Sequence, residues 1–220
     1  MANSFKEIDT SKWVRKTTFD WFKTFDNPTY CFNVKIDVDD IVRFSKETKT
    51  SFFVNFLYLI TRVNNEIESL KLRYVDNKVL LFDRIDATFT TKTSDGSFNN
   101  ASCEYNPNYE EFYKAAKEEV VRRSGPTDNS QTYNRPHYSV FYSSCITSLS
   151  IESLSQPLPL NDKNSLNVPR IFWDRYRLEN GRYVMLLSMN VSHILIDGEE
   201  LASAFNLVQK YCSNFKELIK

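Results

Sequence analysis

The sequence predicts an α+β fold, a two-layer α/β sandwich in which helices pack against one face of a mixed β-sheet. Segments with a strand pattern outnumber segments with helical periodicity, and several strands follow one another through hairpin turns. The same mixture of strands and helices continues on both sides of the loop at 124–130. We therefore expect residues 1–220 to form one domain.

Residues 1–65 are expected to form a short helix, a strand and two further helices. Over 29–38, apolar residues alternate with polar or small ones, which is the period of a strand with one buried face. Asp9 or Ser11 can cap the first helix, and Ser51 can cap the longest one, whose apolar residues recur at helical spacing. The three helices are expected around Trp13, over 41–46 and over 52–65.

The middle of the chain forms short strands and then a helix. Asp76, Asn77 and Lys78 separate two apolar runs, which is a hairpin signal, and β-branched residues dominate the strand that follows. Residues 108–123 place apolar side chains on one helical face and Lys and Glu on the other. The strands are expected over 72–75, 79–82 and 87–93.

The last third of the chain ends in a strand, a bend and a helix. Residues 179–182 are typical of a hairpin turn, which leads into an apolar run that ends at His193. Asp197 follows four residues later, so one imidazole and one carboxylate lie near the join between strand and helix. The strands are expected over 138–142, 168–176 and 183–191, and the helix over 199–211.

Composition indicates a globular protein without an electrostatic bias. Lys+Arg and Asp+Glu number 28 each, which disfavours nucleic acid as a partner. No run approaches the roughly 20 apolar residues that span a bilayer, and no signal peptide pattern opens the chain, so we expect a cytoplasmic location without a membrane partner. The four cysteines show no CxxC spacing and only two histidines occur, which predicts free, buried thiols and no metal site.

The stretch from Asn190 to Gly198 is similar to the His-His-x-x-x-Asp-Gly signature of coenzyme A-dependent acyltransferases, and it most resembles the chloramphenicol acetyltransferase family. Three further matches occur in order along the chain, so that the resemblance covers nearly all of it. The matched residues are Ile8-Asp9 with Trp13-Val14-Arg15-Lys16, Ser144-Cys145-Ile146, and Pro169 with Arg175-Tyr176. The resemblance implies a homotrimer with active sites at subunit interfaces, and acetyl-CoA as co-substrate.

The resemblance assigns His193 as the general base that takes a proton from an acceptor hydroxyl, since the neutral imidazole is available near pH 7. A structural histidine at a strand end is the alternative. Ser144 is expected to donate to the oxyanion of the tetrahedral intermediate, a contribution on the order of 3 kcal/mol, although a plain strand-end serine stays open. His137 has no motif support, and we expect it to be structural.

Two further pairs of residues receive roles from the resemblance. Asp197 is expected to pair with Arg15 and to hold the architecture of the site, rather than to orient His193 as in a serine-protease triad. Arg175 and Tyr176 are expected to contact coenzyme A.

The sequence departs from the family at positions that bear on the acceptor. Ser192 replaces the first histidine of the signature, and Glu199-Glu200 follow its Asp-Gly. The resemblance places Trp21, Phe22 and Phe172 in the acceptor pocket, where Phe22 replaces a tyrosine and Phe172 a threonine. These changes remove hydroxyls and add acid, which leaves the acceptor open between chloramphenicol and another small molecule. A non-catalytic trimeric binding protein on the same scaffold is the alternative from another class.

Overall fold

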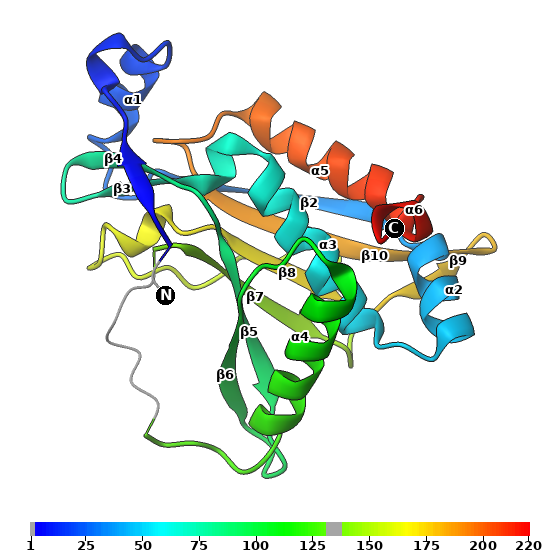
Figure 1. Cartoon of the computed structure of the whole chain (residues 1–220). Helices are drawn as coiled ribbons and strands as arrows, with labels where there is room; N and C mark the ends of the chain where they lie inside the picture. Colours follow the sequence, from blue (N-terminus) through cyan, green and yellow to red (C-terminus); the bar gives the residue numbers. More distant parts are fainter. Residues whose placement is uncertain (1–2, 131–137) are drawn as a thin grey trace.

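A computed structural model of the chain describes residues 3–130 and 138–220, and His137 therefore lies outside the described residues. A seven-stranded sheet has the order β2-β10-β8-β7-β5-β6, with β9 paired to β10, and a three-stranded sheet has the order β1-β4-β3 (Figure 1). The strands are β1 Phe5–Glu7, β2 Thr29–Asp37, β3 Leu72–Val75, β4 Lys78–Phe82, β5 Asp86–Lys92, β6 Phe98–Cys103, β7 Val140–Ile146, β8 Arg170–Asp174, β9 Arg177–Glu179 and β10 Arg182–Ser192.

The large sheet is mixed, because β7 runs parallel to both β5 and β8, whereas all other strand pairs of this sheet are antiparallel. Helices α3, α4 and α5 cover one face of it (Figure 1). This confirms the predicted α+β architecture. The helices are α1 Lys16–Phe22, α2 Asp39–Thr48, α3 Phe52–Glu66, α4 Tyr109–Arg123, α5 Gly198–Cys212 and α6 Phe215–Leu218, with 3-10 turns η1 Thr10–Lys12, η2 Glu68–Lys71 and η3 Ser165–Asn167.

Several elements form where local sequence signals predicted them. The hydroxyl of Ser51 accepts a hydrogen bond from the amide of Val54 and caps α3. Asn180 and Gly181 have φ angles of 48° and 81°, which is the left-handed geometry of a tight hairpin between β9 and β10. This hairpin delivers β10, whose last eight residues are buried, to the end of the sheet.

The structure differs from the predicted elements at the helix around Trp13, at β6 and at the end of β8. The expected helix around Trp13 is two pieces, because Asp9 caps the turn η1 and Trp13 is then extended, with ψ 132°, before α1 begins. Strand β6 was not predicted, since its sequence Phe-Asn-Asn-Ala-Ser-Cys is largely polar and gains its structure by pairing with β5. The expected strand at 168–176 ends at Asp174.

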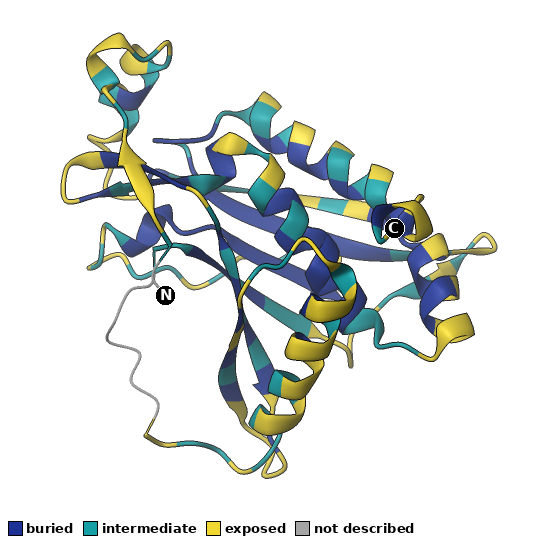
Figure 2. Ribbon diagram, viewed as in Figure 1, coloured by how far each residue is buried: buried dark blue, intermediate teal, exposed yellow. Residues whose placement is uncertain are grey.

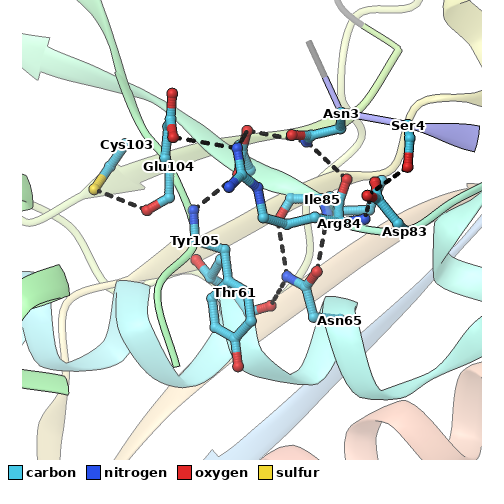
Figure 3. Close-up of polar contacts among 11 residues, drawn as sticks. Asn3, Ser4, Thr61, Asn65, Asp83, Arg84, Ile85, Cys103, Glu104 and Tyr105 are labelled. Carbon is cyan, nitrogen blue, oxygen red and sulfur yellow. Dashed lines mark hydrogen bonds and ion pairs between the residues drawn. The ribbon is translucent and has the colours of Figure 1, made fainter. Parts of the chain in front are cut away.

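A polar network ties the start of the chain to α3 and to the ends of β5 and β6 (Figure 3). The Asn65 side chain of α3 donates to the carbonyl of Ile85 and accepts from its amide, each at 2.8 Å. The side-chain Nδ2 of Asn3 donates to the carbonyl of Arg84 at 2.8 Å. These contacts fix the connection between the small sheet and the large one.

Most strands and the inner faces of the helices are buried, whereas α1 mixes exposed and half-buried residues around the buried Phe19 (Figure 2). One contiguous apolar cluster runs from Phe19 to Leu218. The segment between β7 and β8 lies against the sheet face opposite the helices, where the amide of Leu154 donates to the Asn33 side chain and that of Ile151 to Asp174. Helix α1 lies at the margin of the molecule, beside the end of β10 (Figure 1).

Candidate active site

His193 directly follows β10, in a turn that precedes α5. Its amide donates to the carbonyl of Pro28 at 2.8 Å, and the amides of Leu195 and Ile196 both donate to the carbonyl of Ser192 at 3.1 Å. Asp197 then caps α5 and accepts from the backbone at the third helical position. The backbone on both sides of the imidazole is thereby held in one conformation.

The side chain of Arg15, from the segment before α1, stabilises this turn through hydrogen bonds. Its Nε and Nη2 donate to the two carboxylate oxygens of Asp197 at 2.9 and 2.6 Å, a bidentate ion pair. Nη1 and Nη2 also donate to the carbonyls of Ile194 and His193 at 3.0 and 3.2 Å. The hydrogen bonds from Arg15 hold the pKa of the Asp197 carboxyl below its usual value.

The imidazole of His193 lies between two aromatic rings. It stacks on Phe22 at 3.9 Å between centroids with 13° between planes, and Tyr30 lies 4.7 Å away on a tilted plane. Nδ1 is 3.2 Å from Oδ1 of Asp197 but is not aligned for a hydrogen bond with it. Among the described residues none bonds to Nε2, and 29% of the side chain is exposed. Nε2 is thus the nitrogen open to a ligand. We call Arg15, Phe22, Tyr30, His193 and Asp197 the His193 group.

Aromatic residues at the end of α1 and just after it extend the His193 group toward solvent. The rings of Trp21, Phe22 and Phe25 contact one another, with centroids 4.8 to 5.4 Å apart. Trp21 is 61% exposed and Phe25 37% exposed. A single chain therefore leaves large apolar side chains uncovered next to the imidazole.

Ser144 lies in a different part of the sheet. It is on β7, and its hydroxyl is 3.0 Å from that of Thr90 on β5. It lines a pocket of about 360 Å³ together with Phe172, which is buried, and Arg170. We call this cavity the Ser144 pocket. The neighbouring Ser143 donates to the carbonyl of Thr88 at 3.0 Å, so its hydroxyl already has a partner.

One chain does not bring Ser144 and His193 together. Ser188 of β10 pairs with Phe172 of β8, which pairs with Ser144. Ser192 lies four residues beyond Ser188, so at ~3.3 Å per residue and ~4.8 Å per strand its backbone is on the order of 15 Å from that of Ser144. The residues of the predicted acceptor pocket are separated in the same way. Trp21 and Phe22 lie beside His193, whereas Phe172 lines the Ser144 pocket.

Arg175 and Tyr176 line a separate cavity, of about 330 Å³, at the end of β8. Arg175 is exposed, and Tyr176 packs edge-on against Phe52 at 4.9 Å. Cys145 lines the same cavity. Burial raises the pKa of its thiol to about 12, which keeps it protonated near neutral pH.

The residues that depart from the family signature have structural surroundings of their own. Ser192 is buried, and its hydroxyl has no hydrogen-bond partner among the described residues. The carboxylate of Glu200 accepts from the amide of Asp197 at 2.8 Å, so it completes the cap of α5. Of the two added acids, Glu199 is the more exposed.

Tyr30 and Thr90 are among the residues of these sites that were missed in the sequence. Tyr30 was assigned only to a strand pattern, yet its ring contacts His193 and its hydroxyl donates to the carbonyl of Ile196 at 3.3 Å. Burial and then the charge of Asp197 raise the pKa of Tyr30, so the phenol is neutral. Thr90 approaches Ser144 only through the register of β5 with β7. No short sequence signal marks either contact.

The cysteines and the remaining surfaces add three observations. All four cysteines are free thiols, as predicted, but Cys31 and Cys145 are only half-buried. Within 3–130 and 138–220, no group of three or more His, Cys, Asp or Glu side chains is arranged to hold a metal ion. No helix of that part of the chain is long and apolar enough to cross a membrane.

A family model described as chloramphenicol acetyltransferase matches residues 3–209. The chain belongs to the chloramphenicol acetyltransferase family. Chloramphenicol acetyltransferase 3 of Escherichia coli is 23% identical over 220 residues, covering 96% of this chain and 98% of that protein. A solved chloramphenicol acetyltransferase superposes with a TM-score of 0.87 at 25% identity, covering 95% of this chain and all of the other. A probable dihydrolipoamide acetyltransferase from Listeria monocytogenes 4b F2365 shares the fold alone, with a TM-score of 0.64 at 13% identity, over 94% of this chain and 93% of that one.

Membership of the chloramphenicol acetyltransferase family confirms the resemblance drawn from the His-x-x-x-Asp-Gly stretch and its three companion motifs. It supports an acyltransferase of this type. The identity to the relatives compared, 20 to 25%, is low.

Proposed function

We propose that the protein is an acetyl-CoA-dependent O-acetyltransferase in which His193 is the general base. The observation that carries this proposal is the state of the imidazole. Its plane is held by Phe22, its backbone is held through Arg15 and Asp197, and its Nε2 is open. A rigid imidazole with one free nitrogen suits proton transfer to and from a bound hydroxyl.

In the proposed reaction, Nε2 of His193 takes the proton of the acceptor hydroxyl as its oxygen attacks the thioester carbonyl of acetyl-CoA. The tetrahedral intermediate carries a negative oxygen, which accepts a hydrogen bond from the hydroxyl of Ser144. The carbon–sulfur bond then breaks, and the coenzyme thiolate takes the proton from the imidazolium. The products are an acetyl ester and coenzyme A, without an acyl-enzyme.

The reaction requires the His193 group of one chain to meet the Ser144 pocket of another. Ser144 and His193 of one chain are too far apart to contact the same carbonyl carbon, and the uncovered Trp21 and Phe25 lie beside the imidazole. We therefore propose a homotrimer whose active sites lie at the subunit interfaces. Each interface would cover Trp21 and Phe25 and complete one site.

Acetyl-CoA is proposed to enter through the cavity at the end of β8. Arg175 is exposed at its rim, where a guanidinium can meet phosphate oxygens, and Tyr176 offers an aromatic face. We propose a cytoplasmic enzyme whose acceptor is chloramphenicol or another small hydroxylated molecule. Whether drug resistance is its physiological role depends on that acceptor.

The test is release of free coenzyme A thiol from acetyl-CoA across a panel of hydroxylated antibiotics and small alcohols. The His193→Ala variant should lose turnover by roughly 10²- to 10⁴-fold with an unchanged melting temperature. Lys210→Ala, an exposed change at the far end of α5, serves as the control and should retain full activity. Full activity of His193→Ala would exclude the general-base role. A non-catalytic binding protein would bind acetyl-CoA or an acceptor and release no thiol with any member of the panel.

A further inference from the structure

Arg170 opens strand β8 on the sheet face opposite the helices. Its register partners are Tyr142 on β7 and Asn190 on β10, and Phe172 lies two residues further along on the same face. Arg170 is 7% exposed, although it carries a guanidinium. It therefore belongs to the wall of the Ser144 pocket and not to the solvated surface.

No carboxylate of the described residues pairs with this guanidinium. Nη1 donates to the carbonyls of Ser165 and Val168 at 3.1 and 3.0 Å, and Nη2 to the hydroxyl of Ser165 at 3.4 Å. The guanidinium also lies 5.5 Å from the centre of the Tyr142 ring. All of these partners are neutral. A buried cation without a paired carboxylate is costly, even with the more distant charge of Asp162 acting on it, so a ligand that brings a negative group to Arg170 would be stabilised there.

The rest of the Ser144 pocket does not supply an anion either. Phe172, Leu154 and Pro157 form apolar walls, and Thr90, Ser144 and Gln156 contribute neutral polar groups. Asp and Glu are absent from the described lining. A pocket with apolar walls and one buried cation selects a ligand with an apolar body and one negative group.

We propose that Arg170 binds a carboxylate on the acceptor, so that the substrate class is a small hydroxylated carboxylic acid. This inference rests on the proposed transfer reaction. Arg170 and Ser144 are one strand and two residues apart, a backbone separation of about 8 Å. An acceptor whose carboxylate and hydroxyl are separated by a benzene ring or a short carbon chain spans that distance. The guanidinium offers two parallel N–H groups to such a carboxylate.

Arg170 could instead serve only to hold the turn η3, since its contacts with Ser165 and Val168 are structural. A structural role for Arg170 and a role in carboxylate recognition predict different effects of the ligand's charge. A structural role affects thermal stability and is indifferent to the charge of the acceptor. Recognition of a carboxylate makes the charge of the ligand decide its affinity.

The test uses matched pairs of a hydroxylated carboxylate and its neutral primary amide, such as 4-(hydroxymethyl)benzoate with 4-(hydroxymethyl)benzamide and 6-hydroxyhexanoate with 6-hydroxyhexanamide. Binding to the intact oligomer is measured by titration calorimetry without coenzyme, and turnover by thiol release. The wild type should bind at least one carboxylate about tenfold or more tightly than its amide. Arg170→Gln should bring that ratio close to one, and Arg170→Lys should retain part of it.

Arg43→Gln removes an exposed arginine outside the pocket and is the matched control. A panel in which no carboxylate binds better than its amide overturns the inference. It is also overturned if Arg170→Gln lowers the melting temperature but keeps the ratio, or if neutral acceptors are acetylated as fast as their carboxylates. A carboxylate preference without any thiol release from acetyl-CoA would overturn the transfer reaction and leave the Arg170 site standing. Should Arg170→Gln not fold, the wild-type ratio and Arg170→Lys decide.

Discussion

Arg15 and Asp197 are 182 positions apart in the chain and meet through two hydrogen bonds of 2.9 and 2.6 Å. The same guanidinium donates to the carbonyls of His193 and Ile194. One side chain from the segment before α1 therefore holds both ends of the turn that carries the imidazole. The ion pair links the stability of this turn to the position of the candidate base.

Breaking the ion pair should weaken both the fold and the proposed activity. Arg15→Met and Asp197→Asn should each lower the free energy of unfolding by about 1–2 kcal/mol, less than a fully buried pair, because 39% of the Asp197 side chain is exposed. The double variant should cost less than the sum of the two single changes. Urea denaturation measures these values. Lys16→Ala, which removes an exposed ion pair with Asp20, should change stability by less than about 0.5 kcal/mol. Additive effects of the two single changes would show that the pair is not coupled.

The contribution of Asp197 to stability should fall in acid. Because Arg15 holds the pKa of this carboxyl below 3.8 in the folded state, the ionised form stabilises the fold at higher pH. That stabilisation is lost as the pH falls through the lowered value. The difference in unfolding free energy between the parent and Asp197→Asn should be constant above about pH 5 and shrink at lower pH. Urea melts from pH 3 to 7 measure this difference. They are made in a His193→Ala background, so that charging of the imidazole does not contribute. A difference that stays constant to pH 3 would contradict the assignment.

Elements with local signals could be predicted from the sequence to within a residue or two. Helix α3 begins after its Ser51 cap and ends at Glu66, one residue beyond the expected Asn65, because capping and helical spacing are both written in neighbouring residues. Strand β6 has no such signal, since its residues Phe98–Cys103 become a strand by pairing with β5. Tertiary contacts overrode local preference there.

The same distinction applies to the candidate site. His193, Asp197 and Arg15 lie in motifs that can be matched one by one along the chain. Thr90 reaches Ser144 only because Phe89 pairs with Ser143, and Arg170 joins the Ser144 pocket only because it pairs with Tyr142. Strand register is a property of the assembled sheet and is absent from any short stretch of sequence.

Thr90 should position the hydroxyl of Ser144. Ser144→Ala should lower kcat by about 10²- to 10³-fold, as expected for loss of an oxyanion donor. Thr90→Val keeps the shape of the side chain and removes only the bond of 3.0 Å, so a loss of about fivefold in kcat is expected. In the Ser144→Ala background, Thr90→Val should have no further effect on kcat. Steady-state kinetics at saturating acetyl-CoA measure each step, and independent losses in the double variant would assign Thr90 a role apart from Ser144.

Subunits that are inactive for different reasons should restore each other. Ser144→Ala subunits retain His193, and His193→Ala subunits retain Ser144. If each active site takes these residues from two neighbouring chains, every mixed trimer contains one interface with both residues intact. Trimers that carry two different affinity tags, one on each variant, should therefore show about one third of the wild-type activity.

The experiment separates an interface site from a site within one chain, because mixing cannot repair a site built from a single subunit. Thiol release by doubly tagged trimers is compared with that of each parent variant at the same concentration. Trimers mixed from His193→Ala and the double variant His193→Ala/Ser144→Ala lack the imidazole at every interface and should remain inactive. Mixed trimers no more active than their parents would mean that the distance between Ser144 and His193 closes within one chain, and the two-chain arrangement would be wrong.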